Sequence, residues 1–133
     1  MTLDDYLEAA GKRRWRYGDV DCTLFAADWA LAVSGIDPAD GIRGTYSTAA
    51  EANAIVDRHG GAVAFVGGCL ASIGWRSVQQ PEDGDIGIIS ALAGSDVAVF
   101  RDVPAIHQGG LWLARGLRGI RAAIYQHKAI WRP

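Results

Sequence analysis

Cys22 is the residue of this sequence whose type and position best suit covalent chemistry. It opens segment 22–34, which is almost continuously apolar and has no Gly or Pro before Gly35, and a run of this length predicts a buried helix of about three to four turns. Free amides and the positive end of the dipole at a helix N-terminus lower the pKa of a thiol there. The position therefore suits a nucleophile, with a buried structural cysteine as the alternative.

The remaining thiol and two of the three histidines lie in contexts typical of structural residues. Cys69 follows Phe65-Val-Gly-Gly, where a thiol packs as a small hydrophobic group. His59 precedes Gly60-Gly61 at a predicted helix end, and His127 lies in a polar stretch. Because these cysteines and histidines show no ligand-pair spacing, the sequence predicts no metal site and no disulfide framework.

The elements that must position Cys22 change in character along the chain. Thr2 with Asp5, and Ser47 and Thr48 with Glu51, are typical of helix starts. Helices are expected near residues 2–11, 22–34, 48–60 and 63–73, and strands near 86–89, 97–100, 111–114 and 122–125. Helices followed by a meander predict an α+β fold with an antiparallel sheet.

Length and charge limit the organisation and the partners. A chain of 133 residues, half of them apolar, suits one domain over residues 1–133. The net charge of -2 leaves no basic stripe for a phosphate backbone, so nucleic acid is not an expected partner, and Arg13, Arg14 and Arg16 are interpreted as a solvated run. The first residues lack the pattern of a secretory signal, and no apolar run is long enough to insert into a membrane.

Three ordered motifs carry a family resemblance. Asp21, Cys22, Thr23 and Phe25 form an Asp-Cys-Thr-x-Phe frame, Arg43-Gly-Thr-Tyr-Ser-Thr follows it, and Pro81-Glu-Asp-Gly-Asp-Ile leads into the first long strand. Together they resemble NlpC-type cell-wall cysteine peptidases, in which Ser commonly replaces Thr23. The resemblance implies a papain-like fold, with N-terminal helices packed on a small antiparallel sheet or half-barrel, and hydrolysis of amide bonds in peptidoglycan stem peptides.

The position of the catalytic base departs from that family. Where NlpC-type peptidases have a histidine at the start of the next strand, this chain has Asp96, and His107 lies eleven residues later, near the family's third polar position. A carboxylate is a weak base, and its charge raises the pKa of a nearby thiol. An exchange of roles, with His107 as base and Asp96 orienting it, keeps a Cys–His–acid set. Loss of catalysis with retention of the fold is the competing interpretation.

If the site is active, its chemistry follows from these residues without a cofactor. Cys22 forms a thioester acyl-enzyme, amides at the helix start hold the oxyanion, and the stem peptide lies against Asp21, Trp15 and Tyr17.

Asp-Cys-x-x-Phe-Ala-Ala-Asp-Trp and the terminal Ala-Ile-Trp-Arg resemble proteins encoded in phage and prophage tail gene clusters. That resemblance implies a tail-tip or tail-assembly protein, made in the host cytoplasm without a signal peptide and carried in the virion beside other tail-tip proteins. Two alternatives stay open: a catalytically decayed structural component of the tail, and a cytoplasmic cysteine hydrolase or acyltransferase.

Overall fold

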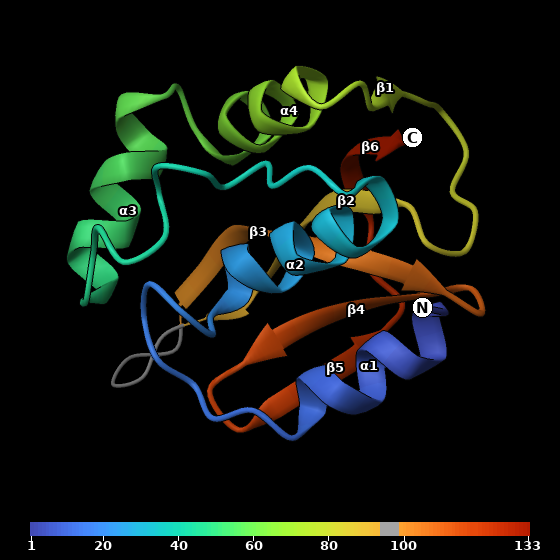
Figure 1. Ribbon diagram of the computed structural model, residues 1–133, viewed down its shortest axis with the longest axis horizontal. Helices are drawn as coiled ribbons and strands as arrows, with labels where there is room; N and C mark the ends of the chain where they lie inside the picture. The colour runs from blue at the N-terminus through green and yellow to red at the C-terminus, as the bar shows by residue number, and fades with distance from the viewer. Residues whose placement is uncertain (94–98) are drawn as a thin grey trace.

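The computed structural model describes residues 1–93 and 99–133, and the chain forms helices first and strands afterwards (Figure 1). The helices are α1 (Leu3–Gly11), α2 (Cys22–Ser34), α3 (Ala49–Arg58) and α4 (Ala62–Ser72). The strands are β1 (Arg76–Ser77), β2 (Ile86–Ala93), β3 (Val99–Gln108), β4 (Leu111–Gly116), β5 (Gly119–Ala123) and β6 (His127–Arg132).

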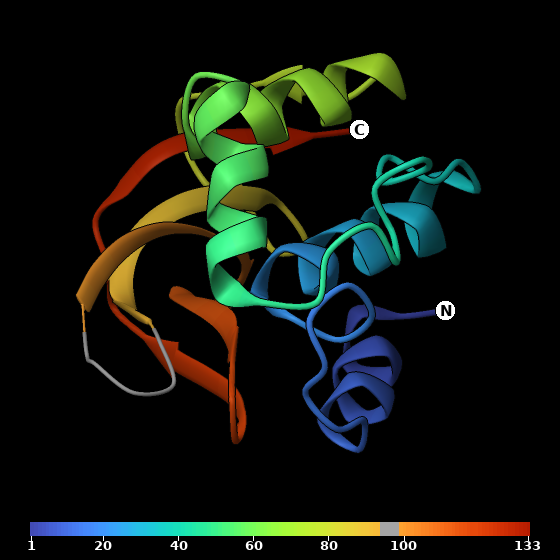
Figure 2. The ribbon, with the colours of Figure 1, turned by 90° about the vertical axis from the view of Figure 1, so that its left-hand side faces the viewer.

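The strands form one antiparallel sheet in the order β1-β6-β2-β3-β4-β5, which does not close into a barrel. The strongly curved sheet carries α1, α2 and α4 on one side (Figure 2). The predicted α+β class is therefore confirmed. Within the described residues, no helix is long and apolar enough to cross a membrane.

Side chains on the two faces of the sheet build two hydrophobic clusters, because successive residues of a strand point to opposite faces. Ile86, Ile88 and Ile106 pack against the helices in the helix-side cluster. The second cluster, named here the sheet-interior cluster, consists of Ile89, Ala91, Val103, Ala105, Trp112 and Ile130. Trp112 lies across Gly87, where a Cβ would overlap its ring.

The predicted helix starts are confirmed. Thr2 accepts from the Asp5 amide while Asp5 accepts from the Thr2 amide, and Thr48 caps α3 through the Glu51 amide. Gly35 ends α2 with φ +71°, a conformation that costs glycine little.

The strand boundaries differ from expectation. β2 and β3 are longer than predicted, β5 begins three residues earlier than expected, and β1 and β6 were not predicted. Pro104 lies inside β3, but β4 pairs with β3 only from Ile106 to Gln108. The Pro104 nitrogen faces that free edge, so no ladder hydrogen bond is lost.

Candidate functional site

The start of α2 is built around the buried carboxylate of Asp21. Its Oδ1 accepts from the amides of Thr23 (3.1 Å) and Leu24 (2.9 Å), and its Oδ2 accepts from the amide of Gly18 (2.9 Å) and the hydroxyl of Tyr46. Asp21 is only 2% exposed. Four donors thus satisfy a carboxylate that forms no ion pair with any described residue, so in this structure Asp21 caps the helix and faces away from solvent.

Gly18 allows the backbone of the loop before α2 to approach the segment that carries Tyr46 closely. Gly18 has φ +83°, and a Cβ there would overlap the carbonyl oxygen of Tyr46. The Gly18 carbonyl accepts from the Gly44 amide at 2.9 Å. The Asp-Cys frame and the Arg-Gly-Thr-Tyr segment are therefore two halves of one junction.

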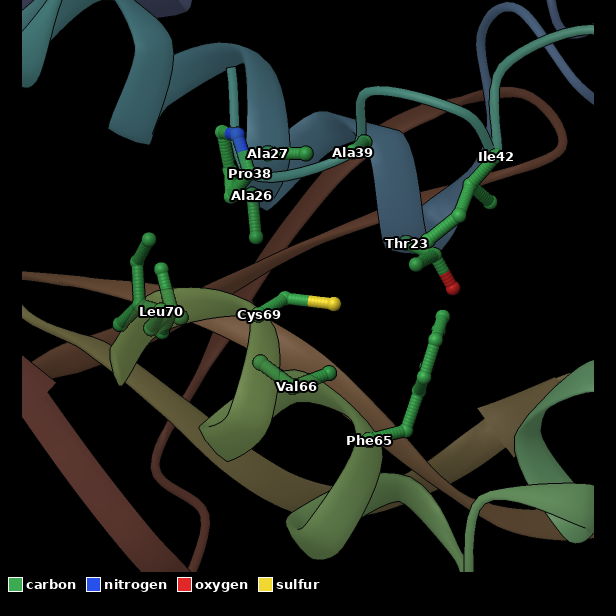
Figure 3. A pocket seen from close by; sticks show the side chains of 11 residues that line it. Thr23, Ala26, Ala27, Pro38, Ala39, Ile42, Phe65, Val66, Cys69 and Leu70 are labelled. Carbon is green, nitrogen blue, oxygen red and sulfur yellow. The ribbon is translucent and has the colours of Figure 1, made fainter. Parts of the chain in front are cut away.

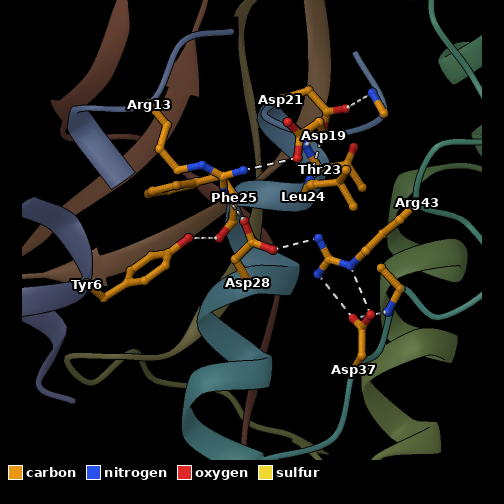
Figure 4. A network of polar contacts seen from close by, with 12 residues as sticks. Tyr6, Arg13, Asp19, Asp21, Thr23, Leu24, Phe25, Asp28, Asp37 and Arg43 are labelled. Carbon is orange, nitrogen blue, oxygen red and sulfur yellow. Dashed lines mark hydrogen bonds and ion pairs between the residues drawn. The ribbon is translucent and has the colours of Figure 1, made fainter. Parts of the chain in front are cut away.

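Arg43 joins this segment to the middle of α2 (Figure 4). Its guanidinium contacts Asp28 Oδ1 at 2.7 Å and binds both oxygens of Asp37, at 2.9 and 3.1 Å. Burial raises the pKa of Asp28, whereas the hydrogen bonds from Arg43 lower the pKa of Asp37. The Arg-Gly-Thr-Tyr motif thus holds α2 in place through both Arg43 and Tyr46.

The thiol of Cys22 lies in apolar surroundings despite its place at a helix start. Cys22 is partly exposed, yet it packs against the sheet-interior cluster, which includes Val103 and Ala105. Burial of the thiol, with a smaller contribution from the Asp21 charge, raises the pKa of Cys22 to about 11. The expected lowering of this pKa by the helix start is therefore wrong, because desolvation outweighs the dipole.

The contacts of Cys22 include no base among the described residues. Its Sγ lies 3.9 Å from the hydroxyl of Thr23, and the backbone amides of Cys22 and Thr23 are its other hydrogen-bonding neighbours in the described part of the chain. Amides at the helix start were expected to help hold an oxyanion, and two of them, those of Thr23 and Leu24, donate to Asp21 instead. At rest, this helix start neither activates the thiol nor presents those two amides to a substrate.

His107 lies near the end of β3, where its ring packs edge-on against Trp112 at 4.9 Å between centroids. Its Nδ1 is buried without a hydrogen bond to any described residue, and lies 3.5 Å from Asp83 Oδ1, which accepts from the Gly109 amide instead. The acid nearest His107 among the described residues is therefore Asp83, which sequence reasoning missed because it lies in the turn before β2.

Within the described residues, no hydrogen bond joins Cys22 and His107. Trp29 donates to the carbonyl of Gly84, whose amide donates in turn to the His107 carbonyl, so His107 is level with the middle of α2. Cys22 precedes Trp29 by seven residues, or about 10 Å along a helix axis. Asp96 lies outside the described residues, so its part in a Cys–His–Asp set stays a prediction.

The other residues of interest have local roles. Trp15 and Tyr17 lie half-buried in the loop before α2, with their rings edge-to-face at 5.2 Å. His59 ends α3, where its Nδ1 contacts the Ile55 carbonyl at 2.7 Å, and His127 begins β6 near Trp112. In residues 1–93 and 99–133, no three His, Cys, Asp or Glu residues are arranged to hold a metal ion.

A narrow apolar pocket lies between α2 and α4 (Figure 3). The Cys69 sulfur points into it from α4, opposite Ala26 and Thr23 of α2. Burial raises the pKa of Cys69, as its apolar sequence context indicates. The cavity volume is about 30 Å³, room for little more than one or two water molecules.

Fold and site together define an α+β protein in which a capped helix begins with a cysteine that packs against the sheet-interior cluster and whose pKa is raised. A family model described as a domain of unknown function (DUF6950) matches residues 1–132, and the chain belongs to that family. Neither the curated proteins nor the solved structures contain a match to this chain.

Proposed function

We propose that this chain is a papain-like domain of NlpC type that serves as a non-hydrolysing structural component of a phage tail tip. Support for the papain-like part comes from the order of the elements, with a cysteine at the start of a buried helix and an antiparallel sheet behind it. Support for the tail comes from the resemblance of the Asp-Cys-x-x-Phe-Ala-Ala-Asp-Trp and Ala-Ile-Trp-Arg motifs to tail-cluster proteins.

The observation that carries the non-hydrolysing part is the environment of Cys22. A cysteine hydrolase needs a thiolate and a base within hydrogen-bond reach. Here the pKa of the thiol is about 11, and its side-chain hydrogen-bond contact among the described residues is the hydroxyl of Thr23, which is not a base. Cys22 packs against the sheet-interior cluster, whose members are all apolar.

The motifs that resemble a peptidase have a second explanation in this chain. Asp21 accepts from Tyr46 and from the backbone of α2, and Arg43 pairs with Asp28 of α2, an arrangement that needs no substrate. Selection for a stable junction preserves such residues after catalysis is lost. A structural component of an assembly needs a stable fold but does not need a reactive thiolate.

Complementation separates the structural role from an enzymatic one. A phage that lacks this gene should make defective particles, and a copy carrying Cys22→Ala should restore infective particles as fully as the wild-type copy. Mass spectrometry of purified virions should detect the protein. A requirement for the thiol, or absence of the chain from the virion, would contradict the proposal.

A direct assay addresses the chemistry. Purified peptidoglycan incubated with the wild-type protein should release no more new amino groups than peptidoglycan incubated with Cys22→Ala. Release that depends on Cys22 would instead establish the hydrolase and would call for His107→Ala and Asp96→Asn as the next variants.

A further inference from the structure

One end of the molecule carries four arginines that the fold brings together from two distant segments. Arg14 and Arg16 lie between α1 and α2, and Arg118 and Arg121 lie on the β4–β5 hairpin. Arg115 of β4 ties these segments, because its guanidinium donates to the carbonyls of Ala10 (2.8 Å) and Arg13 (2.7 Å). All four side chains are exposed, and they are named here the basic end.

The charges of the basic end are not neutralised within the described residues. The neighbouring cations have partners: Lys12 pairs with Glu8 at 3.3 Å, and Arg13 pairs with Asp19 at 3.0 Å. The four arginines of the basic end form no side-chain hydrogen bond or ion pair with any residue in the ranges 1–93 and 99–133. The sequence run Arg13–Arg16 is thus half of a larger patch that only the fold completes.

The opposite end of the molecule is acidic. Asp4 and Asp5 lie in the first turn of α1, and Glu82 and Asp83 lie in the turn before β2. The β3–β4 turn joins them, because Gln108 donates to Asp4 at 2.7 Å and the Gly109 amide donates to Asp83 at 2.9 Å. These four exposed carboxylates are named the acidic end.

Arg132 pairs with one of the four carboxylates of the acidic end, that of Glu82, and leaves the other three without this cation. It contacts Asp85 at 2.7 Å, and Asp85 is almost fully buried. A second contact of Arg132, with Glu82 at 3.3 Å, is longer and exposed on the Glu82 side.

The two ends face in opposite directions. Helix α1 runs beside β4, with its first turn at the β3–β4 turn and its last turn at the β4–β5 hairpin (Figure 1). Nine residues of helix separate the ends by about 13 Å along the axis. Equal ends of two copies repel, whereas opposite ends attract, so charge favours a heterologous contact over a two-fold one.

We propose that copies of this chain associate head to tail, with the basic end of one copy docked on the acidic end of the next. A formal net charge of -2 opposes such association only weakly. A head-to-tail contact repeats from copy to copy and builds a ring or a filament. The inference does not depend on the state of Cys22 or on the proposed tail function, since none of its residues contacts the thiol.

Sedimentation velocity of the wild-type protein tests the association without any variant. At low ionic strength the protein should sediment as a concentration-dependent mixture of monomer and larger species. Raising the salt concentration to about 0.3 M should weaken association about tenfold or more, because exposed charges are screened over less than about 10 Å. A wild-type protein that stays monomeric at low salt overturns the proposal.

Charge exchange tests the geometry. Arg14→Glu with Arg118→Glu should abolish association, as should Glu82→Lys with Asp83→Lys. A mixture of these two double variants should restore pairs of one copy each, because one basic end and one acidic end remain intact. Arg58→Glu and Asp57→Lys on α3, each of which changes the net charge by two units against four in each double variant, lie at neither end and should associate like the wild type.

Each remaining outcome is decisive. Failure of the mixture to pair, or loss of association in the α3 controls, overturns the head-to-tail arrangement. A different result is that the protein binds a short DNA duplex through its basic end while it stays monomeric. That result would assign the basic end to another partner and would also overturn the head-to-tail arrangement. Because all substituted side chains are exposed, circular dichroism should show unchanged folding in every variant.

Discussion

Cys22 at the start of α2 and His107 near the end of β3 are the two residues that the sequence singled out for catalysis. The polar groups at these two places differ in their hydrogen bonding. The carboxylate of Asp21, which lies beside Cys22, accepts hydrogen bonds from four donors. The Nδ1 of His107 is buried without a hydrogen bond to a described residue. The contrast indicates that hydrogen bonds fix the Asp-Cys frame as a structural junction, whereas packing against Trp112 keeps the His107 ring in place.

Removal of the Asp21 carboxylate should give the largest effect. Asp21→Ala leaves the Tyr46 hydroxyl and three amides without an acceptor, and should lower the free energy of unfolding by about 3 kcal/mol. Urea denaturation measures this loss. Asp19→Ala is the matched control and should cost under about 1 kcal/mol, because the one ion pair of exposed Asp19 within the described residues is with exposed Arg13. Equal costs for the two variants would refute the assigned role of Asp21.

The close approach at Gly18 should give the next largest effect. Gly18→Ala combines a positive φ with an overlap on the Tyr46 carbonyl, and should cost about 2 to 3 kcal/mol. Gly44→Ala has a similar φ of +72° but open space around its Cβ, and should cost about 1 kcal/mol. Thermal unfolding of both variants measures how much of the stability loss comes from the steric overlap, because the two glycines have a similar φ. A Gly44→Ala cost as large as that of Gly18→Ala would mean that the overlap is relieved.

The thiol should make stability depend on pH in the alkaline range. Because the pKa of Cys22 is raised from 9 to about 11 in the folded state, the unfolded chain loses its proton first as pH rises. The contribution of Cys22 is therefore complete below about pH 9 and is lost towards pH 11, amounting to about 1 to 2 kcal/mol for a partly exposed thiol.

The measurement for this prediction compares urea midpoints of the wild-type protein and Cys22→Ala between neutral and alkaline pH. The wild type should lose stability faster than the variant. The rate of Cys22 alkylation by iodoacetamide should also keep rising beyond pH 9. A plateau below pH 8 would show a thiolate and reopen the hydrolase reading.

The smallest effect should come from His107. His107→Phe keeps an aromatic ring against Trp112 and removes the Nδ1 that lacks a hydrogen bond, so the free energy of unfolding should change by less than about 1 kcal/mol in either direction. The urea midpoint measures it. A loss of more than about 2 kcal/mol would show that the 3.5 Å contact with Asp83 is a strong ion pair and would remove the contrast with Asp21.

Local sequence signals predicted the helices well because caps act over three or four residues. Thr2 with Asp5 and Thr48 with Glu51 form the expected hydrogen bonds. The strands were harder to predict from the sequence. β6 contains a terminal motif that resembles other proteins but does not indicate a strand, and its pairing depends on β2, some forty residues away in the chain. The Cys22 environment was also hidden, since the sheet-interior cluster that desolvates the thiol is assembled from four separate strands.

The contacts of Arg115 bear on the order in which the chain acquires its structure. The guanidinium reaches the Ala10 carbonyl across 105 residues, and Gln108 reaches Asp4 across 104. Helix α1 leaves the ribosome about a hundred residues before the strand whose Arg115 caps its last turn. Such distant closure is slow, because chain entropy is lost before the contact forms. A nascent chain stopped before β4 therefore holds α1 only through its contacts with α2, where Tyr6 packs against Phe25 and Trp29, and both ends of α1 stay accessible to chaperones or proteases until β4 emerges.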